Sequence, residues 1–271
     1  MGEKKRLNKK GQVTIFIIIA LLIVALCILV YLYYPKIFAS ISPETKNPVT
    51  YIQECIQEQI EENVQIISLQ GGSYVVDENI GYFYKKEGED GNYVKYLCYT
   101  GSNVINTPCI NQEPFLTEHV EQEILDSINQ GIKTCFDNLV KSYENKGYEV
   151  DLKEGIPKVE IIPEGVSTNF NRTLTLTKGD ETNTYRKFEV NLNSNLYEML
   201  EVAKNILIWE MNVGDSLPEA YMYNNPYLKV EKRTKDNDVR IYILTDRNTE
   251  ESFRFAVRSF PLPAGFGTGY I

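Results

Sequence analysis

The sequence predicts an α+β fold in which an N-terminal transmembrane helix precedes an external domain of antiparallel strands with about three amphipathic helices. Three observations predict it. An uncharged apolar run occupies residues 13–34. Three later segments repeat apolar residues at steps of three and four, and several short segments alternate tyrosine or β-branched residues with polar ones. Because these helices and strands follow no regular βαβ order, we expect the sheet to be antiparallel.

The apolar run has the length of a membrane span. Its 22 residues, at a rise of about 1.5 Å each, match a hydrocarbon core of about 30 Å. A secretory signal has a shorter apolar region and then small residues at a cleavage site, whereas this run ends in Tyr31, Tyr33 and Tyr34. Tyrosine suits the headgroup level of a bilayer. We therefore expect a retained transmembrane helix over residues 13–34.

Residues 1–12 form a basic leader that sets the predicted orientation. The leader contains five basic side chains: Lys4, Lys5, Arg6, Lys9 and Lys10. Only two lysines, Lys36 and Lys46, follow the span closely. By the positive-inside rule the N-terminus stays cytoplasmic. We therefore expect a single-pass protein of the cell membrane, with the lipid bilayer as a partner and the C-terminal domain extracellular.

The net charge argues against one class of partner. The chain carries −9 at neutral pH, and because the leader is basic, the external part is more acidic than the whole. Such a surface repels the phosphates of nucleic acid and of anionic lipids. We therefore expect no nucleic-acid partner.

The cysteines divide between the span and the external part. Cys27 lies in the span, and four cysteines follow it: Cys55, Cys98, Cys109 and Cys135. An even number is what an oxidising compartment would leave as two disulfides. Three pairings are possible, of which we favour Cys98 with Cys109 and Cys55 with Cys135. A metal site is the alternative, but no C-x-x-C spacing is present and the chain has one histidine, so we expect no metal and no cofactor.

The first external helix follows a proline-bearing tether over residues 35–47. Asn47 is a suitable cap and Pro48 a suitable first-turn residue. An apolar stripe then recurs at helical steps: Val49, Ile52, Ile56, Ile60, Val64 and Ile67. The helix is expected to end where Gly71 or Gly72 adopts the left-handed cap conformation.

The next segments are a hairpin and a second helix. Residues 72–99 alternate around the turn sequence GEDGN, which is typical of a β-hairpin, and Cys98 ends its second strand. After a loop, Thr117 is the expected cap of a helix whose apolar face runs from Val120 to Tyr143. A bridge between Cys55 and Cys135 would join the apolar sides of the two helices.

The second half is richer in strands. KVEIIPEGV, NRTLTLTKG and TYRKFEVNL predict a three-stranded meander, with KGDETN as the turn between the last two. A third helix is expected over residues 195–210, followed by three strands in YLKVEKRT, VRIYILTD and SFRFAVRSF. The regions 48–147 and 148–271 meet near ENKGYEVDLKEG, and the sequence permits one domain or two.

The residue types present limit which catalytic sites the chain can form. His119 is the only histidine and lies in the first turn of an exposed-looking helix, where we expect it to be solvated. Carboxylates recur along both helices, as Glu54, Glu58, Glu61 and Glu62, and as Glu118, Glu121, Glu123 and Asp126. Their spacing predicts solvated acidic faces rather than a catalytic pair held across a cleft. KDND and EDGN read as turns, although oxygen ligands of this kind also bind calcium weakly. We therefore predict no catalytic residues.

Two features are consistent with an external protein that makes contacts. Asn171-Arg172-Thr173 is an N-glycosylation sequon, which makes Asn171 a candidate modification site. The 19 tyrosines favour binding surfaces, although they also suit an ordinary sheet. The C-terminal tail with GFGTG carries apolar side chains, which we expect to dock on the domain itself or on a partner.

The stretch KKGQVTIF resembles the class III signal peptides of archaeal type IV pilin-like and archaellin-like proteins. The resemblance covers about the first 30 residues and implies cleavage between Gly11 and Gln12 on the cytoplasmic side. The remainder is similar to membrane-anchored surface proteins of archaea. Many pilins carry a glutamate where this chain has Phe16, and pilin stems usually continue as a helix where this chain has Pro35.

Our first functional hypothesis is a membrane-anchored, non-enzymatic protein that binds or assembles with other surface components. The alternative, in which the partners are filament proteins, is a processed pilin-like subunit of a filament or secretion assembly. A second alternative is an anchored enzyme that acts on envelope polymers.

Overall fold

The computed structural model describes residues 22–24, 47–86, 88, 90–102 and 107–260. The chain separates into two units, residues 1–47 and residues 48–271. Of the predicted span only Leu22 to Val24 are described, as helix, and the leader and nearly all of the tether lie outside the described residues. None of the helices in the described ranges has the length and apolar character needed to cross a bilayer.

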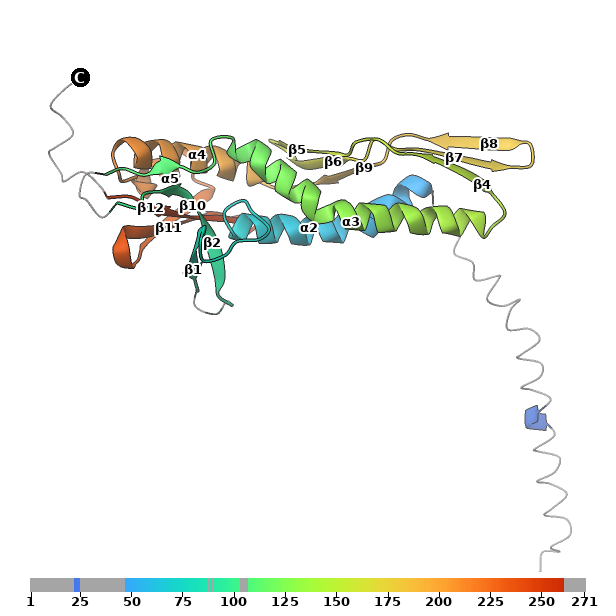
Figure 1. Ribbon diagram of the computed structural model, residues 1–271, viewed down its shortest axis with the longest axis horizontal. Helices are drawn as coiled ribbons and strands as arrows, with labels where there is room; N and C mark the ends of the chain where they lie inside the picture. The colour runs from blue at the N-terminus through green and yellow to red at the C-terminus, as the bar shows by residue number, and fades with distance from the viewer. Residues whose placement is uncertain (1–21, 25–46, 87, 89, 103–106, 261–271) are drawn as a thin grey trace, which may run out of the picture. The chain divides into compact units, whose positions relative to one another are not determined.

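The second unit has an α+β fold with antiparallel sheets, as the sequence predicts (Figure 1). Its helices are α2 (Pro48–Leu69), α3 (Leu116–Glu144), α4 (Leu196–Asn212) and the short α5 (Pro218–Asn224). The largest sheet has the order β1-β2-β12-β11-β10, with β3 also pairing with β2. Its strands are β1 (Gly81–Tyr84), β2 (Asn92–Tyr99), β3 (Ile110–Asn111), β10 (Leu228–Thr234), β11 (Val239–Asp246) and β12 (Ser252–Arg258).

Two smaller sheets have three strands each, in the orders β4-β7-β8 and β5-β6-β9. Their strands are β4 (Glu149–Lys153), β5 (Lys158–Ile162), β6 (Gly165–Asn169), β7 (Thr173–Lys178), β8 (Glu181–Tyr185) and β9 (Glu189–Leu192). Both sheets pack against α3, through β4 and β5.

The helix pair α2 and α3 forms because each helix has one apolar stripe. In α2 the residues Ile52, Ile56, Ile60 and Ile67 are at most 1% exposed, and the matching stripe of α3 is equally buried. A disulfide between Cys55 and Cys135 joins the two helices, and a second closes the loop from Cys98 to Cys109. This is the pairing that the sequence favours.

The end of α2 has the predicted glycine cap. Gly71 and Gly72 have φ angles of 81° and 89°, in the left-handed region where glycine is favoured. The amide of Gly72 donates to the carbonyl of Ile67 at 2.9 Å. A Cβ on Gly72 would lie 2.9 Å from a methyl group of Val120 on α3, so the turn also needs glycine for space.

The predicted cap of α3 is wrong. The helix begins at Leu116, after Phe115, whose side chain makes no capping hydrogen bond. Leu116 is 1% exposed, so burial of this leucine, rather than a hydroxyl cap, fixes the first turn. The hydroxyl of Thr117 instead accepts a hydrogen bond from Lys204 of α4 at 3.3 Å.

The hairpin of β1 and β2 and the three strands β10, β11 and β12 match the sequence prediction, as does the apolar face of α4. One pairing departs from the antiparallel pattern, since β12 runs parallel to β2. The last described strand thereby joins the first hairpin into one sheet.

The predicted meander in the second half is wrong. KVEIIPEGV contains β5, the turn and the start of β6, because β5 and β6 pair across the two residues between Ile162 and Gly165. NRTLTLTKG pairs with ETNTY as β7 and β8, and only Gly179 and Asp180 form the turn. With φ of 61°, Gly179 provides the backbone that so tight a hairpin requires. The third predicted strand therefore divides between β8 and β9, and β9 pairs with β6.

The residues from 48 onward form one compact unit, so the change of composition near residue 148 is not a domain boundary. One hydrophobic core takes side chains from both halves. At its centre Phe136 of α3 meets Phe170 and Phe188 edge to face, at centroid distances of 6.0 and 5.1 Å. The guanidinium of Arg172 lies 4.4 Å from the centroid of the Phe136 ring.

We expect the two disulfides to contribute unequally to stability. The bridge from Cys55 to Cys135 spans 80 residues and that from Cys98 to Cys109 spans 11, and a longer closed loop removes more entropy from the unfolded chain. Replacing the first pair by alanines should lower the free energy of unfolding by about 1–2 kcal/mol more than replacing the second. Urea unfolding of both double variants measures this, and equal losses would contradict it.

Candidate functional site

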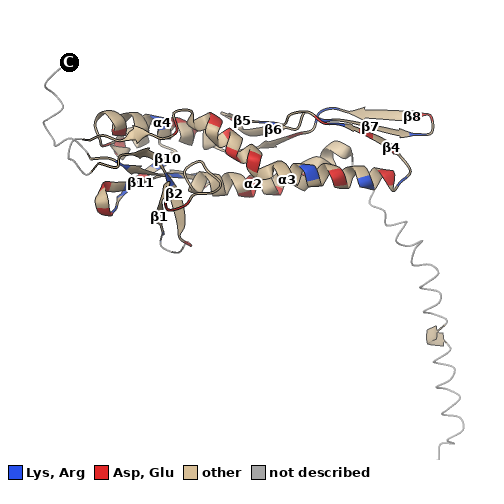
Figure 2. Cartoon of the chain, in the orientation of Figure 1, with Lys and Arg blue, Asp and Glu red and all other residues tan. Residues whose placement is uncertain are grey.

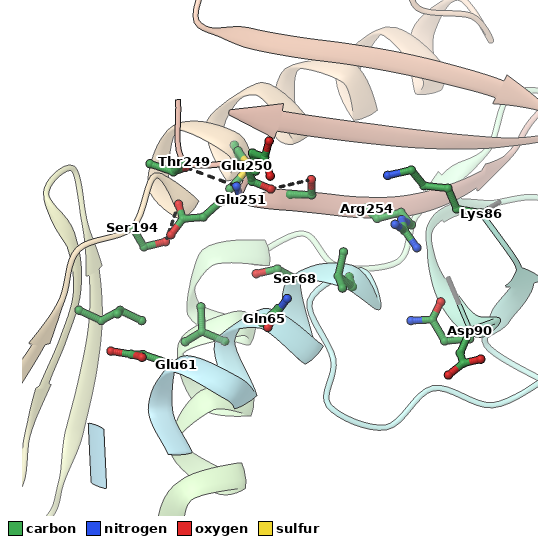
Figure 3. A pocket seen from close by; sticks show the side chains of 16 residues that line it. Glu61, Gln65, Ser68, Lys86, Asp90, Ser194, Thr249, Glu250, Glu251 and Arg254 are labelled. Carbon is green, nitrogen blue, oxygen red and sulfur yellow. Dashed lines mark hydrogen bonds between the residues drawn. The ribbon is translucent and has the colours of Figure 1, made fainter. Parts of the chain in front are cut away.

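A cleft of about 810 Å³ is lined by side chains from separate parts of the body (Figure 3). Four separate segments build it: the second half of α2, the hairpin of β1 and β2, the start of α4 and the turn between β11 and β12. Met199 and Ser68 contribute buried side chains to its floor. Hydroxyl and amide groups make up much of the remaining lining, which suits a polar ligand.

Charged side chains of both signs line the cleft, and its two cationic side chains lie together on one side (Figure 3). Lys86 and Arg254 lie on one side, with Asp90 nearby, while Glu61 and Glu251 lie on the other (Figure 3). A ligand with a negative and a positive end would meet complementary charge at both ends. The cleft thus fits a small dipolar or zwitterionic molecule, or an extended peptide segment.

Arg254 is held in place by the sheet and by an aromatic ring. It lies on β12, is 2% exposed, and its guanidinium carbon is 5.1 Å from the centroid of the Tyr84 ring. Lys235 approaches the same ring, at 5.4 Å. These contacts fix the position of a cationic group at the edge of the cleft.

Glu251 also has a structural role. Its Oε2 accepts hydrogen bonds from the amide of Asn195 at 2.7 Å and from the hydroxyl of Ser194 at 3.4 Å, just before α4 begins. A carboxylate here satisfies a free amide and opposes the positive end of the helix dipole. A ligand that binds at Glu251 would therefore contact the start of α4 as well.

A second polar cluster surrounds the only histidine. The Nε2 of His119 lies 2.8 Å from the hydroxyl of Ser73 and 3.1 Å from the Nζ of Lys95. Lys95 also donates to Ser73 at 3.0 Å and pairs with Glu113 at 2.5 Å. Glu123 approaches His119 to 3.7 Å. The prediction of a solvated histidine is wrong, because the turn after α2 and strand β2 bring a serine and a lysine to the side of α3.

The cluster around His119 has the residue types of an activated serine, but its geometry favours a structural joint. Ser73 is 2% exposed, and it does not line the cleft. The Nδ1 of His119 is 3.7 Å from Glu113, beyond hydrogen-bond distance, so no carboxylate orients the ring. Burial, and then the positive charge of Lys95, lower the pKa of His119. The cluster ties α3 to β2 and to the turn after α2.

Acidic residues occur along both long helices (Figure 2), and they have different contacts. Glu121 accepts a hydrogen bond from the amide of Ile161 at 2.8 Å, and Glu123 accepts one from the amide of Tyr74 at 2.9 Å. Glu61 lines the cleft. Within the described ranges no group of three or more acidic, histidine or cysteine side chains is arranged to hold a metal ion.

The remaining candidate residues lie apart from the cleft. Asn171 is exposed in the turn before β7, with φ of 49°, and its side-chain amide donates to the carbonyl of Ile156 at 2.6 Å. Cys55, Cys98, Cys109 and Cys135 are all in disulfides. Gly11 and Gln12 lie outside the described residues.

Sequence reasoning missed a buried charged network under the end of α4. Glu210 is fully buried, accepts a hydrogen bond from the hydroxyl of Tyr242 and lies 3.1 Å from the guanidinium of Arg240. Burial raises the pKa of Glu210 to about 7, more than the charge of Arg240 lowers it. The signal in the sequence is a single carboxylate in the apolar stretch LIWEM, on the same side of the helix as Ile206 and Leu207.

We expect Glu210 to make stability fall as the pH rises from about 4.5 to about 7. The folded state binds the proton of the Glu210 carboxyl more tightly than the unfolded chain does. The stability that this proton adds is therefore present at low pH and is lost as the pH rises through the folded pKa. Glu210→Gln should remove up to about 3 kcal/mol of this dependence. Urea unfolding at a series of pH values measures the slope, and an unchanged slope in the variant would contradict the assignment.

His119 should make stability depend on pH in the direction opposite to that of Glu210. Its pKa is lowered in the folded state, so the unfolded chain takes up a proton first and stability falls as the pH drops below about 6.5. His119→Gln keeps a polar side chain next to Ser73 and Lys95 but does not titrate. The Tm of the variant should therefore rise relative to the parent chain between pH 6.5 and pH 5. A constant difference in Tm would show that His119 is not the responsible group.

Comparison with known protein families, with curated proteins and with solved structures finds no match to this chain, so the candidate site is defined by its geometry.

Proposed function

We propose that this chain is a single-pass membrane protein whose disulfide-bonded α+β body lies outside the cell and binds or assembles with other surface molecules, without enzymatic activity. The pair of disulfides is the observation that carries the proposal. All four cysteines that follow the apolar run are paired with one another. Disulfides of this kind persist in oxidising surroundings outside the cytoplasm.

The sequence before the body supports an anchor. Residues 13–34 are uncharged and long enough to span a bilayer, and the basic leader favours a cytoplasmic N-terminus. The first helix of the body begins at Pro48, after the 13 residues of the tether. A tether of this length keeps the body near the membrane surface, and Asn171 would then be accessible to glycosylation.

The cleft supports binding as the activity of the body. Lys86 and Arg254 lie apart from Glu61 and Glu251, with Asp90 beside the two cations, which suits recognition of a dipolar molecule more than proton transfer between closely spaced groups (Figure 3). The carboxylate of Glu251 already accepts a hydrogen bond from the amide of Asn195 at the start of α4. Recognition of a polar ligand, or of a polar segment of a neighbouring surface protein, requires only the groups that the cleft already presents.

A pilin-like subunit is the second candidate. The observation that favours it is Gly11-Gln12 after two lysines and before the apolar run, which resembles a prepilin peptidase site. In that case the apolar helix would pack in a filament core after processing. An anchored enzyme that acts on envelope polymers is the third candidate, and it would need the carboxylates of the cleft to act as an acid and a base.

Intact mass and N-terminal sequencing of the protein from its native membrane distinguish the first two candidates. We expect a chain that begins at Met1 or Gly2, with the four external cysteines protected from alkylation until a reductant is added. A chain that begins at Gln12 would favour the pilin-like subunit. External thiols that react before reduction would contradict the extracellular body.

A further inference from the structure

Five apolar residues stand exposed on the last part of α4, on the loop that follows it and on β3, which contacts α4. They are Ile110, Ile208, Trp209, Val213 and Leu217, and they are called the α4 surface below. Trp209 is 54% exposed and Leu217 is 67% exposed, whereas the opposite face of α4 is buried in the core. Four of the five follow one another within ten residues of the chain, and several large apolar side chains exposed so close together often contact another part of a protein or a partner.

The last described residues lie beside this surface. The guanidinium of Arg240 donates to the carbonyl of Gly214 at 2.7 Å and to the carbonyl of Ser259 at 2.7 Å. One side chain thus holds residue 259 next to the residue that follows Val213. The amide of Phe260 donates to the carbonyl of Thr107 at 3.2 Å, in the segment that leads to Ile110. Phe260 is therefore fixed between the two edges of the α4 surface.

The sequence that continues from Phe260 has the composition and the reach to cover the α4 surface. Residues 261–271, PLPAGFGTGYI, have no charged side chain and four large apolar ones: Leu262, Phe266, Tyr270 and Ile271. Eleven residues extend up to about 36 Å. Gly214 follows the end of α4 by two residues, and Ile208 lies only about 6 Å back along the helix from Asn212 at 1.5 Å per residue. The segment therefore reaches every residue of the surface.

We propose that residues 261–271 dock on the α4 surface of the same chain, with Leu262 and Phe266 covering Val213, Leu217 and Trp209. Tethering favours this occupant, because a short linker gives an effective concentration on the order of millimolar. The two prolines at the start of the segment limit the entropy that docking costs. This proposal does not depend on the location or ligand of the body.

Trp209 is the only tryptophan, so its fluorescence reports directly on the surface. The experiment compares the full chain in lipid nanodiscs with a chain that ends at Phe260, using acrylamide quenching. We expect at least a twofold larger quenching constant and a red-shifted emission in the shorter chain. A full-length double variant, Leu262→Ser with Phe266→Ser, should behave like the shorter chain. Thr268→Ser, which removes little apolar area, is the matched control and should keep the protection.

Two outcomes would overturn the proposal. Equal quenching in the full chain and the shorter one would show that the segment does not cover Trp209. Protection that disappears when each nanodisc holds a single chain would assign the surface to a second copy. A synthetic peptide of residues 261–271 that restores protection to the shorter chain, and fails to do so with both apolar residues changed to serine, would support docking through Leu262 and Phe266.

Discussion

The pairing of α2 with α3 is the contact on which the rest of the body depends. The two buried stripes, clamped by the disulfide from Cys55 to Cys135, form a long apolar platform. The largest sheet packs on it through β12, one small sheet through β4, and the other through β5 and β9. Burial of the stripes stabilises the folded chain, whereas the disulfide acts mainly on the unfolded chain, so the platform combines two independent sources of stability.

The elements of this fold were predictable from the sequence where a local pattern determines them. The helical steps of α2, α3 and α4 and the alternation in the hairpin of β1 and β2 are properties of neighbouring residues, and the structure agrees with them. The parallel pairing of β12 with β2 was not predictable, because it joins residues more than 150 positions apart. The tight turn at Gly179 was missed because polar residues on both sides resemble a longer loop.

The candidate site was less predictable than the fold. The cleft brings together four segments from residue 61 to residue 254, and no one of them carries a motif. His119 appeared solvated because its own helix is polar around it, but Ser73 and Lys95 arrive from elsewhere in the chain. The disulfide pairing was predictable, because few pairings were possible and both favoured bridges fit the helix faces and the short loop.

The position of β12 has a consequence for synthesis. A chain made from its N-terminus presents β2 long before residues 252–258 exist, so an edge of the first hairpin stays unpaired until those residues have been made. Cys55 and Cys135 have both emerged much earlier, and their bridge can form while the sheet is still open. An unpaired edge is prone to pair with other chains. The disulfide-bonded pair of α2 and α3 thus gives the growing chain a partly ordered core during the time in which the edge of β2 is exposed to other chains.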